Sequence, residues 1–396
     1  MKKIFNISPN NSFSGTLRIR LSLIFIFAGM IVVSAVHPGI DTTEEDWNLH
    51  VTTFEPVLFS DDHVSEGFLA PLDDGRIMLI FRLDPGLEGS HVGTKGYIAK
   101  IIYDPVVDKW SEVETVYNSH RYDDRNIHGG VTREGRIVLF FRRYIPDGQV
   151  TEGRYFIYSD DNGETWSDLQ VSGVLGGIPG TGQMFYNQDA EKYCIMEYLR
   201  GKNSILFSDD GSAWEESVLV AEDPDVALTE IAGAWCGDNR IVALIRDDER
   251  KEGFPLLQTE SQDNGQTWSR PLPTNIPPDD HWGCAPQLIY DNTRDLLIAI
   301  TSDRYSRPDE ENSLFIYTAK PDDVFGNPGD WTLQYELLRP WAREDFQEDR
   351  PVNQHFYGYP TIAPVSDDEY LIVFTERNQM HGTEQADLYY FRLRFD

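Results

Sequence analysis

Short apolar runs, each opened by an acidic turn and closed by an arginine, recur along the chain. The clearest copies read "DDGRIMLIFR" and "REGRIVLFFR", and looser ones include "AEKYCIMEYLR" and "DDEYLIVFTER". The six copies end at Arg82, Arg142, Arg200, Arg246, Arg304 and Arg377. Each run is rich in β-branched residues and follows another short apolar segment by about a dozen residues, so each unit predicts a β-hairpin.

A second motif lies between the apolar runs and contains an acid, a glycine and a tryptophan at fixed spacing. It reads "SDDNGETW" at 159–166, "SDDGSAW" at 208–214 and "SQDNGQTW" at 261–268. A calcium loop of the EF-hand type needs more carboxylates and a closing Glu, which these copies lack. We interpret the motif as a hairpin connection. Its Asp accepts backbone N–H groups, Gly163 or Gly265 supplies a positive φ, and the Trp packs on a neighbouring layer.

Repeats with a period of about 50 residues indicate a propeller or an array. Six units of four strands around an axis leave only short, protected sheet edges, which predicts an all-β, six-bladed β-propeller. The final run, 387–395, has no partner after it, so we expect it to close the ring against 55–60. We expect one propeller domain at 55–396, preceded by a linker at 36–54.

The first 35 residues have the composition of a secretory signal. They hold four positive residues and no acid, followed by the apolar run "LSLIFIFAGMIVVSA", which is short for a membrane span and ends in small residues. This pattern predicts a signal peptide cleaved near Ala35 and a secreted or periplasmic protein; an uncleaved anchor is the alternative.

The chain carries a net charge of −32, and removing the four positive residues of the signal segment would shift it to −36. Such a charge repels nucleic acids and anionic membrane surfaces, so we expect neither as a partner. We expect a monomer that needs no cofactor, and no His or Cys spacing indicates zinc, although the sequence leaves metal binding open. The three cysteines are expected to be small buried side chains, with one disulfide after export as the alternative.

The Trp-containing boxes, the strand repeat and the signal segment together resemble the sialidase superfamily of six-bladed propellers, over roughly residues 50–396. That fold hosts several activities, so function depends on the residues at its axis. In such propellers the innermost strand of each blade begins at the mouth of a central funnel. The residues that the repeat places there are Glu66, His128, Gln183, Glu230, the stretch His281, Trp282 and Cys284, and Tyr359.

The resemblance also suggests roles for particular residues. "TEIAGAWCGDNRIVALIR" is similar to a sialidase stretch with a Glu and a carboxylate-binding Arg, here Glu230 and Arg246. "SDRYSRP" offers Arg304 or Arg307 as a further Arg of the clamp. "YGYPTIAPVSDDEYLIVFTE" resembles the stretch with the nucleophilic Tyr, here Tyr359, and a later Glu, here Glu376. Further substrate contacts are expected from Arg125, His355 and Tyr357.

The first blade departs from the sialidase pattern, because "SEGF" places Glu66 where the family has an Arg. No Asp is firmly placed as the acid/base residue; Asp84 and Asp123 are candidates. A His, a Tyr and an Arg suit a different reaction on acidic sugars, in which a proton α to a uronate carboxylate is removed and the group on C4 is expelled. The chain therefore also looks like a uronate lyase or dehydratase, with His128 and Tyr359 as its acid and base.

Three functions stay open at this point. The first is an enzyme that degrades a uronic-acid-containing or sulfated extracellular polysaccharide by elimination or hydrolysis. The second is an exo-sialidase, and the third is a glycan-binding propeller without catalysis. For all three functions we expect an acidic oligo- or polysaccharide as the partner. Product formation would distinguish an enzyme from a binding module.

Overall fold

The computed structural model describes residues 48–52, 54–58, 62–86, 90–148, 150–172, 178–199, 201–214, 216–248, 253–278, 281–303, 313–338, 356–380 and 383–396. These residues belong to one compact unit at 47–396. The expected signal segment, including Ala35, lies outside the described residues. The described part is nearly all β, with one helical turn, α1 (Pro321–Val324).

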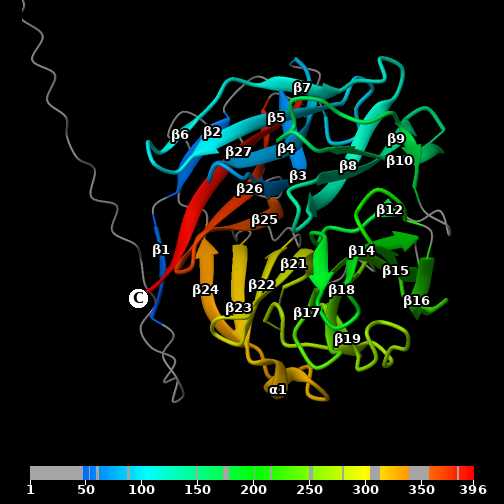
Figure 1. Ribbon diagram of the computed structural model, residues 1–396, viewed down its shortest axis with the longest axis vertical. Coiled ribbons are helices and arrows are strands. Elements are labelled where there is room, and N and C mark those ends of the chain that lie inside the picture. The colour runs from blue at the N-terminus through cyan, green and yellow to red at the C-terminus, as the bar shows by residue number, and fades with distance from the viewer. Residues whose placement is uncertain are drawn as a thin grey trace, which may run out of the picture. The chain divides into compact units, whose positions relative to one another are not determined.

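The strands form six antiparallel units, which we call blades 1 to 6 and which surround a common centre in Figure 1. Blade 1 contains β3 (His63–Pro71), β4 (Ile77–Asp84), β5 (Tyr97–Asp104), β6 (Lys109–Trp110) and β7 (Glu114–Tyr117). Blade 2 contains β8 (Asp123–Val131), β9 (Ile137–Ile145), β10 (Val150–Ser159) and β11 (Gln170–Val171). Blade 3 contains β12 (Ile178–Pro179), β13 (Phe185–Asn187), β14 (Lys192–Leu199), β15 (Lys202–Ser208) and β16 (Glu216–Glu222).

Blades 4 to 6 repeat the arrangement. Blade 4 contains β17 (Leu228–Trp235), β18 (Ile241–Asp247), β19 (Leu257–Ser261) and β20 (Leu272–Pro273). Blade 5 contains β21 (Gly283–Asp291), β22 (Leu296–Asp303), β23 (Ser313–Ala319) and β24 (Thr332–Leu338). Blade 6 contains β25 (Phe356–Ser366), β26 (Glu369–Met380) and β27 (Thr383–Phe395), and its outer strands are β1 (Leu49–Val51) and β2 (Glu55–Leu58). The six predicted apolar repeats correspond to the second strand of each blade.

The chain ends close the ring as the sequence predicts. β2 pairs antiparallel with β27, with Glu55 opposite Tyr390. β1 also pairs with β27, with Leu49 opposite Phe395, so residues 49–51 belong to blade 6 and not to the linker expected at 36–54. The innermost strands contact one another around the ring. β3 contacts β8, β8 contacts β12, β13 contacts β17, β17 contacts β21, β21 contacts β25, and β25 returns to β3.

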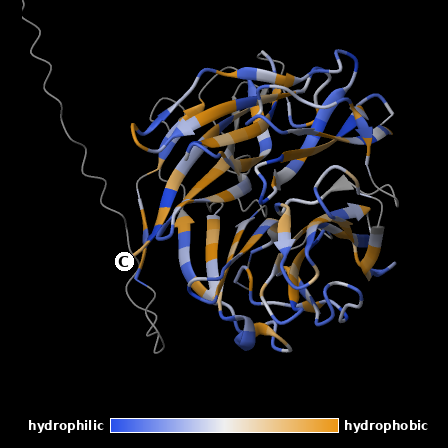
Figure 2. Cartoon of the chain, viewed as in Figure 1, coloured by the Kyte–Doolittle hydropathy of each residue, from blue (hydrophilic) through white to orange (hydrophobic). Residues whose placement is uncertain are grey.

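The hydrophobic core is divided into six clusters, and each lies between two consecutive blades. On β22, for example, Leu296, Ile298 and Ile300 pack toward blade 6, while Leu297 and Ala299 pack toward blade 4. Both faces of each sheet are therefore buried, which explains why the repeat is a continuous apolar run and not an alternating one. In Figure 2 the hydrophobic residues, coloured orange, lie along the strands of the blades.

A tryptophan of the outer turn lies in five of these six interfaces. The set is Trp110, Trp166, Trp214, Trp268 and Trp331, and each packs between its own blade and the preceding one. Blades 1 and 5 have unrelated outer turns in sequence, yet each supplies a Trp to the interface with its preceding blade. Trp331, for instance, also donates from Nε1 to Oε1 of Gln258 in blade 4, at 2.8 Å.

The predicted role of the boxes as scaffolding is confirmed by their hydrogen bonds. Asp161 accepts the backbone N–H of Thr165 at 2.8 Å and its hydroxyl at 2.6 Å. These bonds lower the pKa of Asp161 to about 2, and the bond with the Thr165 hydroxyl has the largest effect. Gly163 has a φ of 78°, and a Cβ there would lie 2.5 Å from the methyl carbon of Met78 in blade 1. The glycine is thus required by the turn and by close packing between blades.

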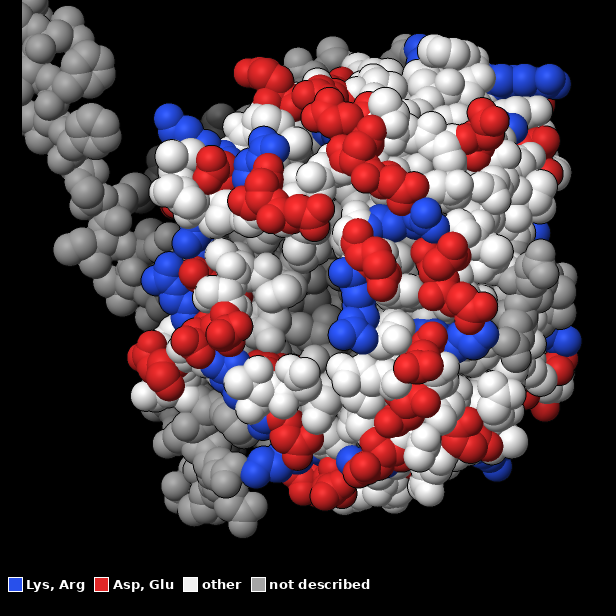
Figure 3. Space-filling view, in the orientation of Figure 1, with Lys and Arg blue, Asp and Glu red and all other residues white. Residues whose placement is uncertain are grey.

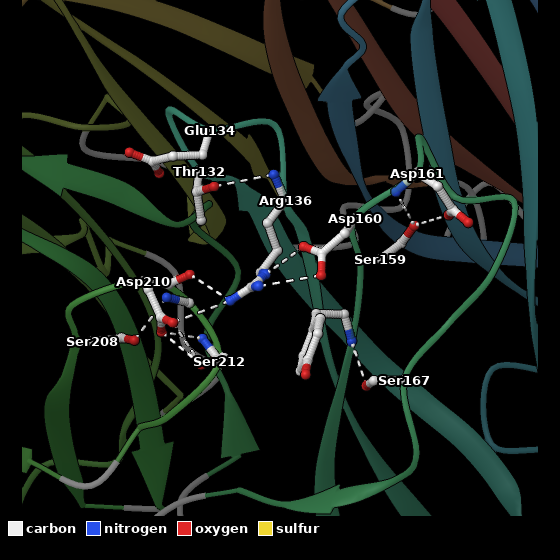
Figure 4. Close-up of polar contacts among 12 residues, drawn as sticks. Thr132, Glu134, Arg136, Ser159, Asp160, Asp161, Ser167, Ser208, Asp210 and Ser212 are labelled. Atoms are coloured by element: carbon white, nitrogen blue, oxygen red, sulfur yellow. Dashed lines mark hydrogen bonds and ion pairs between the residues drawn. The ribbon is translucent and has the colours of Figure 1, made fainter.

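Arg136 ties two neighbouring boxes together, as Figure 4 shows. Its guanidinium contacts Asp160 of its own blade through two bonds, the shorter at 2.6 Å, and reaches Oδ2 of Asp210 in blade 3 at 3.3 Å. Other acidic side chains are spread over the face shown in Figure 3, with a few Lys and Arg side chains near its centre. The three cysteines are free and buried, which confirms their expected role as small core residues.

Replacing the box aspartates should lower stability without changing the chemistry of the folded protein. We expect Asp161→Ala and Asp263→Ala each to lower the Tm by roughly 2–4 °C, because each removes two hydrogen bonds to a charged acceptor. Thermal unfolding followed by circular dichroism measures this effect. Asp168→Ala is the control, since that exposed carboxylate makes no hydrogen bond among the described residues. A collapse of turnover per folded molecule would place the boxes in the functional site.

Candidate active site

The innermost strands break their pairing register at one common level. In blades 1, 2, 4, 5 and 6 a bulge interrupts the first hairpin of the blade. At four of these bulges a residue other than glycine has a positive φ: Glu66 at 49°, Asn126 at 54°, Ala285 at 47° and Tyr359 at 48°. Bulges re-aim side chains, and left-handed backbone at such residues is strained and concentrated at functional sites.

A pocket lies where these bulges meet. Its lining comes from five blades and consists of Glu66, Gly67, Asn126, Ile127, Gly180, Thr181, Gln287, Tyr359 and Pro360. Glu66 and Tyr359 were both expected at the mouth of the funnel, and both line the pocket. The residues from different blades that share this pocket can act together only because the ring is closed.

Polar bonds between blades lie beside the pocket. Gln183 donates from Nε2 to the hydroxyl of Thr361 and to the carbonyl of Ile362, both at 2.6 Å. Thr181 donates its hydroxyl to the carbonyl of Pro286 at 2.9 Å, and Gln287 donates back to the carbonyl of Thr181. Gln183, which was expected to contact substrate, thus bonds blade 3 to blade 6 and is absent from the pocket lining.

Tyr359 forms a cluster with a histidine that sequence reasoning did not single out. The hydroxyl of Tyr359 lies 3.4 Å from Nε2 of His91, and the two rings stack with centroids 5.8 Å apart. Nη2 of Arg125 lies 3.3 Å from the same nitrogen. A guanidinium can only donate, so this contact assigns Nε2 as the acceptor. Arg125 also donates to Oε1 of Glu66 at 2.9 Å, so the acid in the first blade holds this arginine.

Buried charges hold the segment that carries His91. Arg82 donates to Asp123 at 2.8 Å and to the carbonyl of Ser90 at 3.1 Å, while Asp84 accepts the backbone N–H of Ser90 at 3.1 Å. Arg82 is completely buried. Asp84 and Asp123, the two candidate acid/base residues, are therefore part of the support for His91. Burial is the largest influence on Asp123 and raises its pKa.

Arg142 is bonded to Asn126, which lines the pocket. It donates from Nε to Oδ1 of Asn126 at 2.6 Å and from Nη1 to the hydroxyl of Thr151 at 3.1 Å. Burial raises the pKa of the nearby Tyr198 hydroxyl, and the negative charge of Glu230 raises it further. Tyr198 is therefore a neutral phenol at neutral pH.

Glu230 and Arg246 form a buried ion pair, with Nη1 of Arg246 2.9 Å from Oε2 of Glu230. The same Arg246 contacts Asp248 at 2.6 Å and lies over the ring of Trp282, 4.5 Å from its centroid. Glu230 also accepts the backbone N–H of Ala285 at 2.8 Å. The expected carboxylate-binding Arg is thus already engaged by two acids of the protein.

His281 and Trp282 hold the start of blade 5. Nδ1 of His281 lies 2.6 Å from Oδ2 of Asp303, and Trp282 donates from Nε1 to the carbonyl of Asp247 at 2.9 Å. Trp282 is buried, and His281 contacts Phe315 edge-on. Neither residue lines the pocket. Their described contacts are structural.

His128 lies in the interior of blade 2. It is 2% exposed, and its Nε2 has no hydrogen-bond partner among the described residues. Burial lowers the pKa of His128 to about 3. It is absent from the pocket lining, because it lies two residues past Asn126, at a position paired with Phe140. The structure thus assigns a neutral, packed imidazole to a residue expected to transfer protons.

Several predicted site residues lie outside the described residues. They are Arg304, Arg307 and His355, and the side chains of Tyr357 and Glu376. Among the described residues there is no cluster of three or more His, Cys, Asp or Glu able to hold a metal ion. That part of the chain also contains no helix long and apolar enough to cross a membrane.

Comparisons with known proteins agree with the fold. Residues 97–288 match the family described as the BNR repeat-like domain. No curated protein sequence matches the chain. A protein of unknown function from Dyadobacter fermentans has a similar structure, with 15% identity and a TM-score of 0.71 over 88% of this chain and 99% of that one.

Structures of sialidases are also similar. The NanB sialidase of Streptococcus pneumoniae matches with 14% identity and a TM-score of 0.61, over 86% of this chain and 70% of that one. The intramolecular trans-sialidase of Ruminococcus gnavus matches with 13% identity and a TM-score of 0.57, over 84% and 94% of the two chains. The repeat match over residues 97–288 and these structures agree that the chain shares the fold of these sialidases.

Proposed function

We propose that the protein is a carbohydrate-active enzyme that acts on an acidic sugar at the pocket beside Tyr359. The observation that carries the proposal is the contact between the Tyr359 hydroxyl and Nε2 of His91, at 3.4 Å, next to the guanidinium of Arg125. A phenol, an imidazole acceptor and a fixed positive charge are the groups that proton transfer on an anionic sugar requires. The strained backbone at Tyr359 supports a functional role for this cluster.

Elimination at a uronate is the reaction that this chemistry suits best. A base removes the proton on C5, α to the carboxylate, the C4–O bond breaks, and a double bond forms between C4 and C5. The leaving oxygen takes up a proton from the general acid. Tyr359 and His91 would share the two roles, and positive charge would stabilise the enolate. His91 thereby takes the place first expected for His128, whose imidazole is buried away from the pocket.

Hydrolysis of a terminal sialic acid is the second candidate, and the shared fold with sialidases favours it. In that reaction Tyr359 would attack the anomeric carbon as a nucleophile. The ion pair of Glu230 with Arg246 limits this candidate, because both residues are engaged with one another at 2.9 Å. The absence of an Arg at position 66 limits it further.

The proposal includes export. The predicted signal peptide and the strongly acidic surface fit a protein that acts on polysaccharides outside the cell. We propose a secreted or periplasmic monomer, without a cofactor, that binds acidic glycans and neither nucleic acid nor membrane. Fractionation of cells that express the full chain, with N-terminal sequencing of the product, tests cleavage near Ala35.

The decisive experiment offers the protein three sets of oligosaccharides: uronate-containing, sialylated and neutral. Ultraviolet absorbance reports the conjugated double bond of an elimination product, and mass spectrometry separates loss of water from hydrolysis. Elimination predicts absorbance from the uronate set alone. Free sialic acid without absorbance would favour the second candidate, and binding without any product would favour a glycan-binding module.

Tyr359→Phe tests the cluster directly. The variant keeps the ring and its stacking but loses the hydroxyl, so we expect kcat to fall by about 100-fold or more while KM stays nearly constant. His91→Ala should give a similar loss, and the double variant should be little worse than either single one. Tyr290→Phe makes the same chemical change at the Asp295 contact in the β21–β22 hairpin and should leave turnover intact. Normal turnover in both site variants would exclude this cluster from the chemistry.

His128 should control stability in acid and not the rate. Because its pKa is lowered to about 3, its stabilising contribution is complete above the unfolded pKa of about 6.5 and is lost as the pH falls from there. We expect wild type to lose stability relative to His128→Leu by about 1.4 kcal/mol per pH unit over this range. Denaturant unfolding at several pH values measures the difference between the two proteins. A limb of the kcat profile near neutral pH that disappears in the variant would contradict this assignment.

A further inference from the structure

Four arginines of the inner hairpins, Arg82, Arg125, Arg142 and Arg246, differ in how their charge is balanced. Three of these four are held by carboxylates in buried ion pairs. The pairs are Arg82 with Asp123 at 2.8 Å, Arg125 with Glu66 at 2.9 Å, and Arg246 with Asp248 at 2.6 Å and Glu230 at 2.9 Å. Each of these three guanidinium groups therefore has a carboxylate partner within the protein.

Arg142 is the exception among these four. Its hydrogen bonds go to neutral acceptors, the amide oxygen of Asn126 and the hydroxyl of Thr151, and its guanidinium lies 4.7 Å from the ring centroid of Tyr144. No carboxylate of the described residues lies within ion-pair distance of it, and it is partly exposed. The bonds occupy Nε and Nη1, so N–H donors of Nη2 point to no protein acceptor that the structure describes.

The surroundings of Arg142 make an anion favourable there. Burial lowers the pKa of Arg142, and the positive charge of Arg125 lowers it further. An anion bound between them would offset both effects, and it would do so in a region of reduced dielectric, where charge pairs are stronger than in water. Asn126 lines the pocket and holds Arg142 at 2.6 Å, which connects the guanidinium to the pocket.

We infer that Arg142 is the anion-binding residue of this site and that its ligand is the carboxylate or sulfate group of an acidic sugar. The inference rests on the proposed function and names the group of the substrate that is recognised. A planar guanidinium fixed at Nε and Nη1 presents its remaining donors in one orientation, which suits a planar carboxylate or a sulfate oxygen pair. Arg246, the residue expected from sequence, has two carboxylates and an aromatic ring around it and offers less to a ligand.

Binding measurements test the inference without depending on turnover. Isothermal titration calorimetry with glucuronate, a glucose sulfate and glucose separates carboxylate, sulfate and neutral recognition. We expect Arg142→Gln to weaken binding of the acidic sugar by about 10- to 100-fold and to leave the neutral sugar unchanged. Arg142→Lys keeps the charge without the fork and should give an intermediate loss. Arg394→Gln is the matched control, since that arginine of β27 is half exposed and pairs with Glu369 of β26.

Thr151→Val keeps the charge of Arg142 but removes one of the acceptors that orient it, and it covers the case in which Arg142→Gln fails to fold. A loss of affinity for the acidic sugar in this variant supports the inference. Equal affinity of wild type, Arg142→Gln and Thr151→Val for every acidic sugar would overturn the role of Arg142 and leave the proposed function standing. An absence of any acidic-sugar binding by wild type would overturn both.

Discussion

Burial of both faces of every sheet between neighbouring blades is the constraint on which the rest of the structure depends. No blade can be stable alone, because each apolar cluster draws its residues from two blades, and Trp110 joins blade 1 to blade 6 just as Trp166 joins blade 2 to blade 1. Pairing of β27 with β1 and β2 then ties the last blade to the start of the unit. The innermost strands are fixed from both sides as a result.

That rigidity is what allows strain at the centre. Left-handed backbone at Glu66, Asn126 and Tyr359 costs of order 1–3 kcal/mol at each residue and persists only where the surrounding structure over-determines it. Here each bulge lies between paired strands on one side and a neighbouring blade on the other. The outer turns and the central pocket therefore depend on each other. The turns supply the packing between blades, and this packing holds the strained bulges that orient the side chains of the pocket.

The fold was predictable from the sequence because it is repeated. Six apolar runs, three Trp boxes and an unpaired last strand specify the blades and the way the ring closes. A degenerate copy of the repeat can be recognised by comparison with the clearer copies. The site is not repeated, so no such correction exists there. Glu66 and Tyr359 lie at bulges and line the pocket, whereas His128 lies two residues past the bulge residue Asn126, is buried and is absent from the pocket lining. His91 precedes β5 in a segment outside the repeat. The two glycines that follow it, Gly93 and Gly96, were the sequence feature that could have drawn attention to this segment.

Charge balance explains why the arginine repeat could not by itself identify the ligand-binding residue. The same repeat position is occupied by Arg82, Arg142 and Arg246, and sequence treats the three alike. Their difference arises from acids supplied by other strands and blades: Asp123 reaches Arg82 from blade 2, while Glu230 reaches Arg246 from the first strand of its own blade. At Arg142 the corresponding bulge residue is Asn126, whose amide can orient a guanidinium but cannot neutralise it. An acid at that bulge would satisfy the arginine, and an amide leaves its charge for a ligand.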